Sequence, residues 1–180
     1  MVKTTRIDVT PRLAVHIAGS MTIHAPAAKP YCVWITGLSG SGKSTLAQAL
    51  FAQLQQCGTP AFVLDGDHLR QGLCVDLGFS DADRHENIRR AGAVARLMFD
   101  AGLVVICAFV SPFAADRDRV RHLFPAGRFI EVYLSTPLAT CAARDPKGLY
   151  ARAATDAALG LTGVQAPYEP PAEPELTLDT

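Results

Sequence analysis

A glycine-rich stretch in the first third of the chain has the residue types and spacing of a phosphate-binding loop. It reads Gly37-Leu38-Ser39-Gly40-Ser41-Gly42-Lys43-Ser44-Thr45 and fits the pattern G-x-x-x-x-G-K-[ST], in which backbone N–H groups surround phosphate oxygens. In such a loop the lysine reaches the β- and γ-phosphates, and the next hydroxyl is a ligand for Mg²⁺. The pattern arises by chance in on the order of one per cent of chains this long, so a plain glycine-rich turn is the weaker alternative. We predict that a nucleoside triphosphate binds at residues 37–45.

A second polar group, Asp65-Gly66-Asp67-His68-Leu69-Arg70, directly follows an apolar run at 61–64. Two carboxylates two residues apart can divide two tasks, one near the water shell of Mg²⁺ and the other as the base for an acceptor hydroxyl. An Asp-Gly turn that caps a helix is the alternative. With the phosphate loop upstream, we favour the catalytic interpretation. The sequence has no N-K-x-D guanine motif, which argues against a GTPase.

Further candidates for anion binding lie downstream. Arg84 and Asn87 are three residues apart on one face of a predicted helix from Asp81 to about Ala101. An arginine in a cleft is suited to gripping phosphate or sulfate. Ser111 follows the most apolar run, and residues 144–150 (Arg-Asp-Pro-Lys-Gly-Leu-Tyr) form a charged loop with Pro and Gly. Such a loop suits a lid that closes over phosphates.

The elements that position these residues alternate between strands and helices. Apolar, β-prone runs at 31–35, 61–64, 103–110 and 129–134 are predicted strands, and helices fit between them. This alternation predicts an α/β fold with a parallel sheet, which binds ligands at the carboxyl ends of its strands.

The two ends of the chain carry weaker signals. We predict an N-terminal extension or linker at 1–28. Three interpretations of this segment remain open: a flexible lead, a small hairpin, and the tail of an upstream domain. A domain at 29–180 follows. Its tail from Gly163 onward is rich in Pro and Glu, with a short β-like run at 176–178. We expect this tail to wrap the surface and to fray at its end.

Composition excludes several classes of partner. The chain has 180 residues, of which 49% are hydrophobic and 19% charged, enough for the core of one domain. Seventeen basic side chains balance seventeen acidic ones, so we expect neither nucleic acid nor a membrane surface as a partner. Five scattered cysteines and the lack of a signal-peptide core favour a reducing compartment. We expect a cytoplasmic protein.

Together, these motifs resemble those of the adenylyl-sulfate kinases, from about Tyr31 to Thr180. The landmarks that carry the resemblance occur in the family's order: the loop at 37–45, Asp-Gly-Asp at 65–67 with Arg70, Leu-Gly-Phe-Ser at 77–80, Asp83-Arg84 with 86–90, Ser-Pro-Phe at 111–113 with Asp116-Arg117, residues 144–150, Thr162-Gly163, and Pro-Tyr-Glu at 167–169. The resemblance implies a three-layer P-loop NTPase-type kinase domain, a parallel sheet flanked by helices, with a small lid. It also implies ATP- and Mg²⁺-dependent phosphorylation of adenosine 5′-phosphosulfate (APS) at its 3′-hydroxyl, for sulfate activation.

The resemblance assigns roles to individual residues. Nucleotide binding is expected at Gly37, Leu38, Ser39, Gly40, Ser41, Gly42, Lys43, Ser44, Thr45, Arg144 and Lys147. Substrate binding is expected at Asp67, Arg70, Phe79, Arg84, Asn87, Val110, Ser111, Lys147 and Leu161. Ser44 and Asp65 are expected to hold Mg²⁺, in part through water, and Lys43, Asp67 and Ser111 are the expected catalytic residues.

In descriptions of the family, the serine at the position of Ser111 is assigned as the site of a phosphoserine intermediate. Phosphoryl transfer needs little covalent help once Mg²⁺, lysine and arginine carry the charge. We therefore expect direct in-line transfer, with Ser111 contacting the substrate.

Three positions depart from the family's usual residues: His68 stands in place of Asn, Leu161 in place of Phe, and Ala114 in place of Arg. Two alternative functions follow from the departures and from the unplaced ends of the chain. One is a kinase of another nucleotide-linked anion, and the other is a non-catalytic nucleotide-binding module of a sulfate-activating system. For partners beyond ATP and APS, we expect a homodimer, or fusion or association with a sulfate adenylyltransferase.

Overall fold

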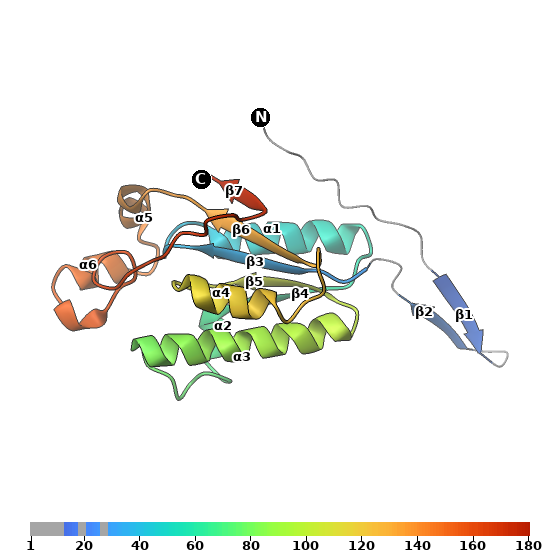
Figure 1. Cartoon of the computed structure of the whole chain (residues 1–180). Coiled ribbons are helices and arrows are strands. Elements are labelled where there is room, and N and C mark those ends of the chain that lie inside the picture. The colour runs from blue at the N-terminus through green and yellow to red at the C-terminus, as the bar shows by residue number, and fades with distance from the viewer. Residues whose placement is uncertain (1–12, 18–20, 26–28) are drawn as a thin grey trace.

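The computed structural model describes residues 13–17, 21–25 and 29–180 (Figure 1). Its strands are β1 (Leu13–Ile17), β2 (Met21–Ala25), β3 (Cys32–Gly37), β4 (Ala61–Asp65), β5 (Val104–Ala108), β6 (Phe129–Leu134) and β7 (Leu176–Leu178). Its helices are α1 (Lys43–Gln56), α2 (Gly66–Arg70), α3 (Asp81–Asp100), α4 (Ala114–Arg121), α5 (Leu138–Arg144) and α6 (Leu149–Ala153), with a short 3₁₀ turn at Ala157–Leu159.

Five strands form one parallel sheet in the order β4-β5-β3-β6-β7. The central strands β3 and β5 are buried along their whole lengths, as expected for a parallel sheet covered on both faces. Strands β1 and β2 pair with each other in an antiparallel hairpin that is separate from this sheet. Of the three readings of residues 1–28, the hairpin matches the described part of that segment.

Helices cover both faces of the sheet and complete three layers. Figure 1 shows α1 on one face and α3 and α4 on the other. The α1 layer contains Ala47, which packs against Ile35 and Ile106 from the sheet. The α3 layer contains Ile88 and Ala91, which lie in one cluster with Trp34. The predicted three-layer α/β fold is confirmed.

Two expectations about strand ends were wrong. The run at 103–110 is not one continuous strand, because β5 ends at Ala108 and the chain then turns, with Ser111 at a φ of 41°. The C-terminal end is not frayed. Strand β7 pairs with β6, and the Thr180 hydroxyl lies 2.6 Å from that of Thr136. A parallel edge strand supplies ladder hydrogen bonds that hold the tail.

Within the described ranges, no helix has both the length and the apolar character needed to cross a bilayer.

Candidate active site

The glycine-rich loop connects β3 to α1 at the carboxyl edge of the sheet, as predicted. Gly40 has a φ of 77°, and a Cβ there would lie 2.9 Å from the carbonyl oxygen of Cys141. Gly37 is similarly confined, since a Cβ would lie 2.8 Å from the carbonyl oxygen of Leu134. These glycines let the backbone curl tightly under the start of α1, where unpaired N–H groups and the helix dipole favour an anion.

Lys43 lies inside this loop and binds its backbone. Its Nζ donates to the Leu38 carbonyl at 2.6 Å and lies 3.5 Å from Ser41 Oγ. Burial, together with the nearby charge of Lys147, lowers the pKa of Lys43 to about 8. A phosphate placed at the loop would supply the negative charge that favours the protonated lysine. The positive charge of Lys43 therefore favours binding of an anion at the loop.

Ser44 and Asp65 form a hydroxyl–carboxylate pair between the loop and β4. Ser44 Oγ donates to Asp65 Oδ2 at 2.6 Å, and Asp65 Oδ1 accepts from the backbone N–H of Asp67 at 2.9 Å. Asp65 is thus the N-cap of α2, so the alternative reading of this Asp-Gly as a helix cap is also correct. A hydroxyl and a carboxylate are the hard oxygen donors that Mg²⁺ takes, with substrate phosphates completing its shell. Across the described ranges, no cluster of three or more His, Cys, Asp or Glu side chains could hold a metal without such help.

The charged loop at 144–150 contacts the phosphate loop and helix α2. Lys147 forms an ion pair with Asp67. The Tyr150 hydroxyl donates to the Ser39 carbonyl at 2.8 Å, and Arg144 contacts the Thr180 hydroxyl at 3.4 Å. These contacts place the charged loop beside the phosphate loop and Asp67.

A second group of residues surrounds the exposed ring of Phe79. The guanidinium of Arg70 lies over this ring at 4.3 Å from its centroid, and that of Arg84 lies at 5.8 Å. Arg70 also donates to the carbonyls of Leu77 and Gly78 at 3.1 and 2.9 Å. An aromatic face flanked by two cations is suited to a planar base that carries anionic groups.

Arg84 connects α3 to the segment that contains Leu161. It donates to the Thr162 hydroxyl and the Gly160 carbonyl, each at 2.7 Å, and to the Phe79 carbonyl at 2.9 Å. Burial, with a smaller effect from Arg70, lowers the pKa of Arg84. Leu161 itself is 9% exposed. Its neighbours Gly160 and Thr162 were missed as partners of Arg84, because 76 and 78 residues separate them in sequence.

Asn87 has an unused hydrogen-bonding atom. The residue is 7% exposed, and its Oδ1 has no hydrogen-bond partner within the described part of the chain. An unpaired buried acceptor costs free energy, so a hydrogen bond donated to this atom by a bound molecule would be favourable.

Ser111 is enclosed rather than open to the cleft. The residue is 1% exposed, and its Oγ accepts from Trp34 Nε1 and donates to Thr36 Oγ1, both at 3.1 Å. The Thr36 hydroxyl in turn donates to the Val110 carbonyl at 2.8 Å. Trp34 and Thr36 were also missed, because they lie in an apolar strand that by itself indicates only core packing.

Helix α2 joins the two groups of residues. Asp67, beside the phosphate loop and the lid, and Arg70, beside Phe79, are three residues apart and so lie on the same side of this helix. Helix α2 therefore carries one residue of each group. A cavity of about 610 Å³ is lined by Leu38 of the loop, by Tyr133 and by residues 163–168. No charged side chain lines it.

Comparisons with known proteins give matches over most of the chain. The family model for adenylylsulphate kinase matches residues 29–179. The adenylyl-sulfate kinase of Shewanella denitrificans is 60% identical over 151 residues, which are 84% of this chain and 74% of the relative.

Two solved structures extend the comparison. The structure of the Mycobacterium tuberculosis APS kinase CysC in complex with AMPPNP and APS has a TM-score of 0.80 at 46% identity, and the match covers 84% of this chain and 88% of that one. A hexameric APS kinase from Thiobacillus denitrificans has a TM-score of 0.63 at 36% identity, covering 84% of this chain and 25% of that one.

Proposed function

Because this chain belongs to the adenylylsulphate kinase family, we propose that the site described above transfers the γ-phosphoryl group of ATP to the 3′-hydroxyl of APS. The products are ADP and 3′-phosphoadenylyl sulfate, which makes the protein an enzyme of sulfate activation. The observation that carries the assignment to this site is the position of Asp67 on α2, between the phosphate loop and the Arg70–Phe79 pair.

The donor half of the site is built around the phosphate loop. Residues 37–45 would surround the phosphates of ATP, and Lys43 would exchange its contact with the Leu38 carbonyl for phosphate oxygens. Lys147 and Arg144 would cover the nucleotide from the lid. The link between Tyr150 and the Ser39 carbonyl supports this role, because it already ties the lid to the loop.

Ser44 and Asp65 would hold Mg²⁺ with the phosphates, Ser44 directly and Asp65 through water. The ion, when bound, neutralises charge that develops on the phosphate oxygens. The pairing of the two side chains at 2.6 Å supports a shared ligand, since both are oxygen donors at the mouth of the loop.

The acceptor half would bind APS through its adenine, ribose and phosphosulfate. Phe79 and Leu161 would contact the adenine, and Arg70 and Arg84 would hold the anionic phosphosulfate. Asn87 would use its unpaired Oδ1 to accept a hydrogen bond from the substrate. The remaining contact would come from Val110, at the turn after β5 that the enclosed Ser111 hydroxyl holds in place.

In the transfer step, Asp67 would accept the proton of the 3′-hydroxyl while the oxygen of that hydroxyl attacks the γ-phosphorus. The bond to the β–γ bridging oxygen breaks, and ADP leaves with the electron pair. The enclosure of the Ser111 hydroxyl between Trp34 and Thr36 supports direct transfer without a phosphoserine.

A coupled assay with ATP, Mg²⁺ and APS tests this function. We expect ADP release that depends on all three, with a panel of other nucleotides giving much slower release. Faster turnover of another nucleotide-linked anion would favour the first alternative function. Binding of ATP without any turnover, by protein shown to be folded, would favour a non-catalytic module.

Three broader proposals accompany this function. Residues 29–180 would form the catalytic domain and residues 1–28 an extension, in keeping with a family match that starts at residue 29. We propose a cytoplasmic location, since all five cysteines are free thiols. We also propose self-association or association with a sulfate adenylyltransferase, which the hexameric relative supports only as far as self-association.

A further inference from the structure

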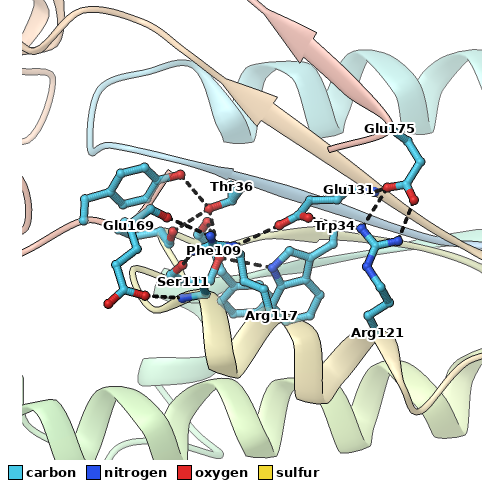
Figure 2. Close-up of polar contacts among 12 residues, drawn as sticks. Trp34, Thr36, Phe109, Ser111, Arg117, Arg121, Glu131, Glu169 and Glu175 are labelled. Atoms are coloured by element: carbon cyan, nitrogen blue, oxygen red, sulfur yellow. Dashed lines mark hydrogen bonds and ion pairs between the residues drawn. The ribbon is translucent and has the colours of Figure 1, made fainter. Parts of the chain in front are cut away.

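A buried ion pair lies outside the groups assigned to catalysis. Arg117, on α4, is 2% exposed and Glu131, on β6, is 6% exposed. Arg117 Nε donates to Glu131 Oε1 at 2.8 Å (Figure 2). Removing two charges from water is costly, so a buried pair of this kind is poor evidence for added stability. The other contacts of the Arg117 guanidinium indicate the role of this pair.

The guanidinium of Arg117 joins three segments that are distant in sequence. Besides Glu131, it donates through Nη1 to the Ser111 carbonyl and through Nη2 to the Glu169 carbonyl, each at 2.7 Å. Because the guanidinium is planar and its N–H directions are fixed, these contacts set the relative positions of β6, the turn after β5 and the C-terminal segment.

The turn that Arg117 contacts has an unfavourable backbone conformation. Ser111 has a φ of 41°, a region that residues other than glycine rarely adopt. Such a conformation persists when surrounding contacts hold it in place. Here Trp34 and Thr36 hold the Ser111 side chain, as described above, and Arg117 holds its carbonyl. The turn is therefore fixed from both sides.

The C-terminal segment closes over the same turn. The Glu169 backbone N–H donates to the Pro112 carbonyl at 2.8 Å, and its carboxylate accepts from the Ala114 N–H at 2.6 Å. The Tyr168 hydroxyl lies 2.9 Å from Thr36 Oγ1. Since Thr36 gives its single proton to the Val110 carbonyl, Tyr168 is the donor in this contact.

Glu131 is itself held from the opposite direction. Its Oε2 accepts from Arg121 Nη2 at 3.1 Å, and its backbone N–H donates to Glu175 at 2.6 Å. Arg121 also binds Glu175, with a contact of 2.9 Å. Arg121 thus keeps an acidic partner when Glu131 is replaced, which makes a substitution of the buried pair practicable.

We propose that Arg117, oriented by Glu131, is a positioning residue for APS: it ties the C-terminal segment to the turn at 110–112 and so aims Val110 at the acceptor. This inference rests on the proposed function, in which that turn contacts the substrate. None of the residues assigned to the donor half contacts Arg117. The loss of Arg117 should therefore weaken the use of APS and leave the binding of ATP unchanged.

The test is a double variant, R117M/E131M, which removes both buried charges at once. Replacing a whole buried pair by apolar side chains of similar size commonly preserves folding. We expect kcat/KM for APS to fall between about 10- and about 100-fold, the range for misplacement of a substrate contact by about 1 Å. We expect KM for ATP to be unchanged. The conservative variant R117K keeps the charge but loses the planar guanidinium. Its kcat/KM for APS should lie between that of the double variant and that of the wild type.

Fluorescence supplies a readout that does not depend on the reaction. Trp34 is the only tryptophan in the chain, and its indole N–H binds Ser111. If the turn loosens, water replaces the Ser111 hydroxyl, and the emission of the double variant shifts to longer wavelength. The matched control, R96M/D100M, removes an exposed ion pair on α3 and should change neither kinetics nor emission.

Wild-type kinetics and emission in a folded R117M/E131M protein would overturn the proposal. If that variant does not fold, R117K serves as the test. Wild-type kinetics and emission in R117K would also overturn the proposal. If the wild type does not phosphorylate APS, the proposed function fails, and the emission comparison still tests whether Arg117 fixes the turn.

Discussion

Replacing Asp67 by Asn tests the centre of the proposed reaction. The change keeps the shape of the side chain and removes its ability to take a proton. The fold should tolerate it, because the cap of α2 uses the backbone N–H of Asp67 and the carboxylate of Asp65. The ion pair with Lys147 is lost, but both side chains are half exposed or more, and a pair of this kind contributes less than about 1 kcal/mol.

The expected loss of rate is much larger than the loss of stability. A positioned general base contributes about 10²- to 10⁴-fold, so D67N should lower kcat by that factor. This corresponds to about 3–5 kcal/mol in activation free energy at 1.36 kcal/mol per tenfold. Affinity for a non-hydrolysable ATP analogue should change little, since the proposed work of Asp67 is done in the transition state.

The measurements are kcat and KM for APS by coupled assay, affinity for the ATP analogue by calorimetry, and Tm. The matched control is D100N, which removes a half-exposed carboxylate paired with Arg96 far along α3 and should have wild-type kinetics. Equal losses in turnover and nucleotide affinity would mean that Asp67 serves the metal or the fold. Undiminished turnover would refute its role as the base.

Four further predictions concern the donor loop and the helix packing. Since the pKa of Lys43 is lowered to about 8 and bound phosphates should raise it, binding of the ATP analogue near pH 8 should take up protons. Calorimetry in two buffers of different ionisation enthalpy measures this uptake, and its absence would contradict the electrostatic account of the loop. Because this pKa is lowered from its ordinary value of 10.5, the unfolded chain holds more protons than the folded one between pH 8 and pH 10.5. The Lys43 contribution to the free energy of unfolding should therefore increase with pH across that window. S44A should raise the Mg²⁺ concentration needed for half-maximal activity while leaving metal-free ADP binding intact; an unchanged Mg²⁺ requirement would remove Ser44 from the metal site. G92A should destabilise the protein by about 1–3 kcal/mol, although alanine normally favours a helix, because a Cβ there would lie 2.7 Å from Val120 Cγ2; a raised Tm would show that α4 moves aside easily.

Many features of the fold could be predicted because they depend on neighbouring residues. The strands at 61–65 and 129–134 and the long helix from Asp81 follow from local apolar patterns. The boundaries were predicted less well. The apolar run at 103–110 continues past Ala108, but the strand does not, because the contacts that turn the chain at Ser111 come from β3, α4 and the C-terminal segment. No local pattern in 103–110 encodes those partners.

The acceptor half also combines features that the sequence predicts with contacts that only the structure shows. Phe79 and Arg84 were recognised from their place in a family pattern, but the contact of Arg84 with Gly160 and Thr162 joins residues more than seventy positions apart. The unpaired Oδ1 of Asn87 is likewise a property of the packed structure. Ser111 was expected to contact the substrate, whereas its hydroxyl is occupied by Trp34 and Thr36 in the structure.

By itself, the sequence determined the phosphate loop, the alternation of strands and helices, and the family, because backbone preferences and short motifs act over a few residues. The comparisons confirm the kinase activity that this family membership implies. Only the tertiary structure decided which distant side chains share a hydrogen bond, and it showed the buried Arg117 joining β6, the Ser111 turn and the C-terminal segment. Such contacts depend on how layers pack, since a guanidinium buried away from water must find its acceptors wherever the fold brings them.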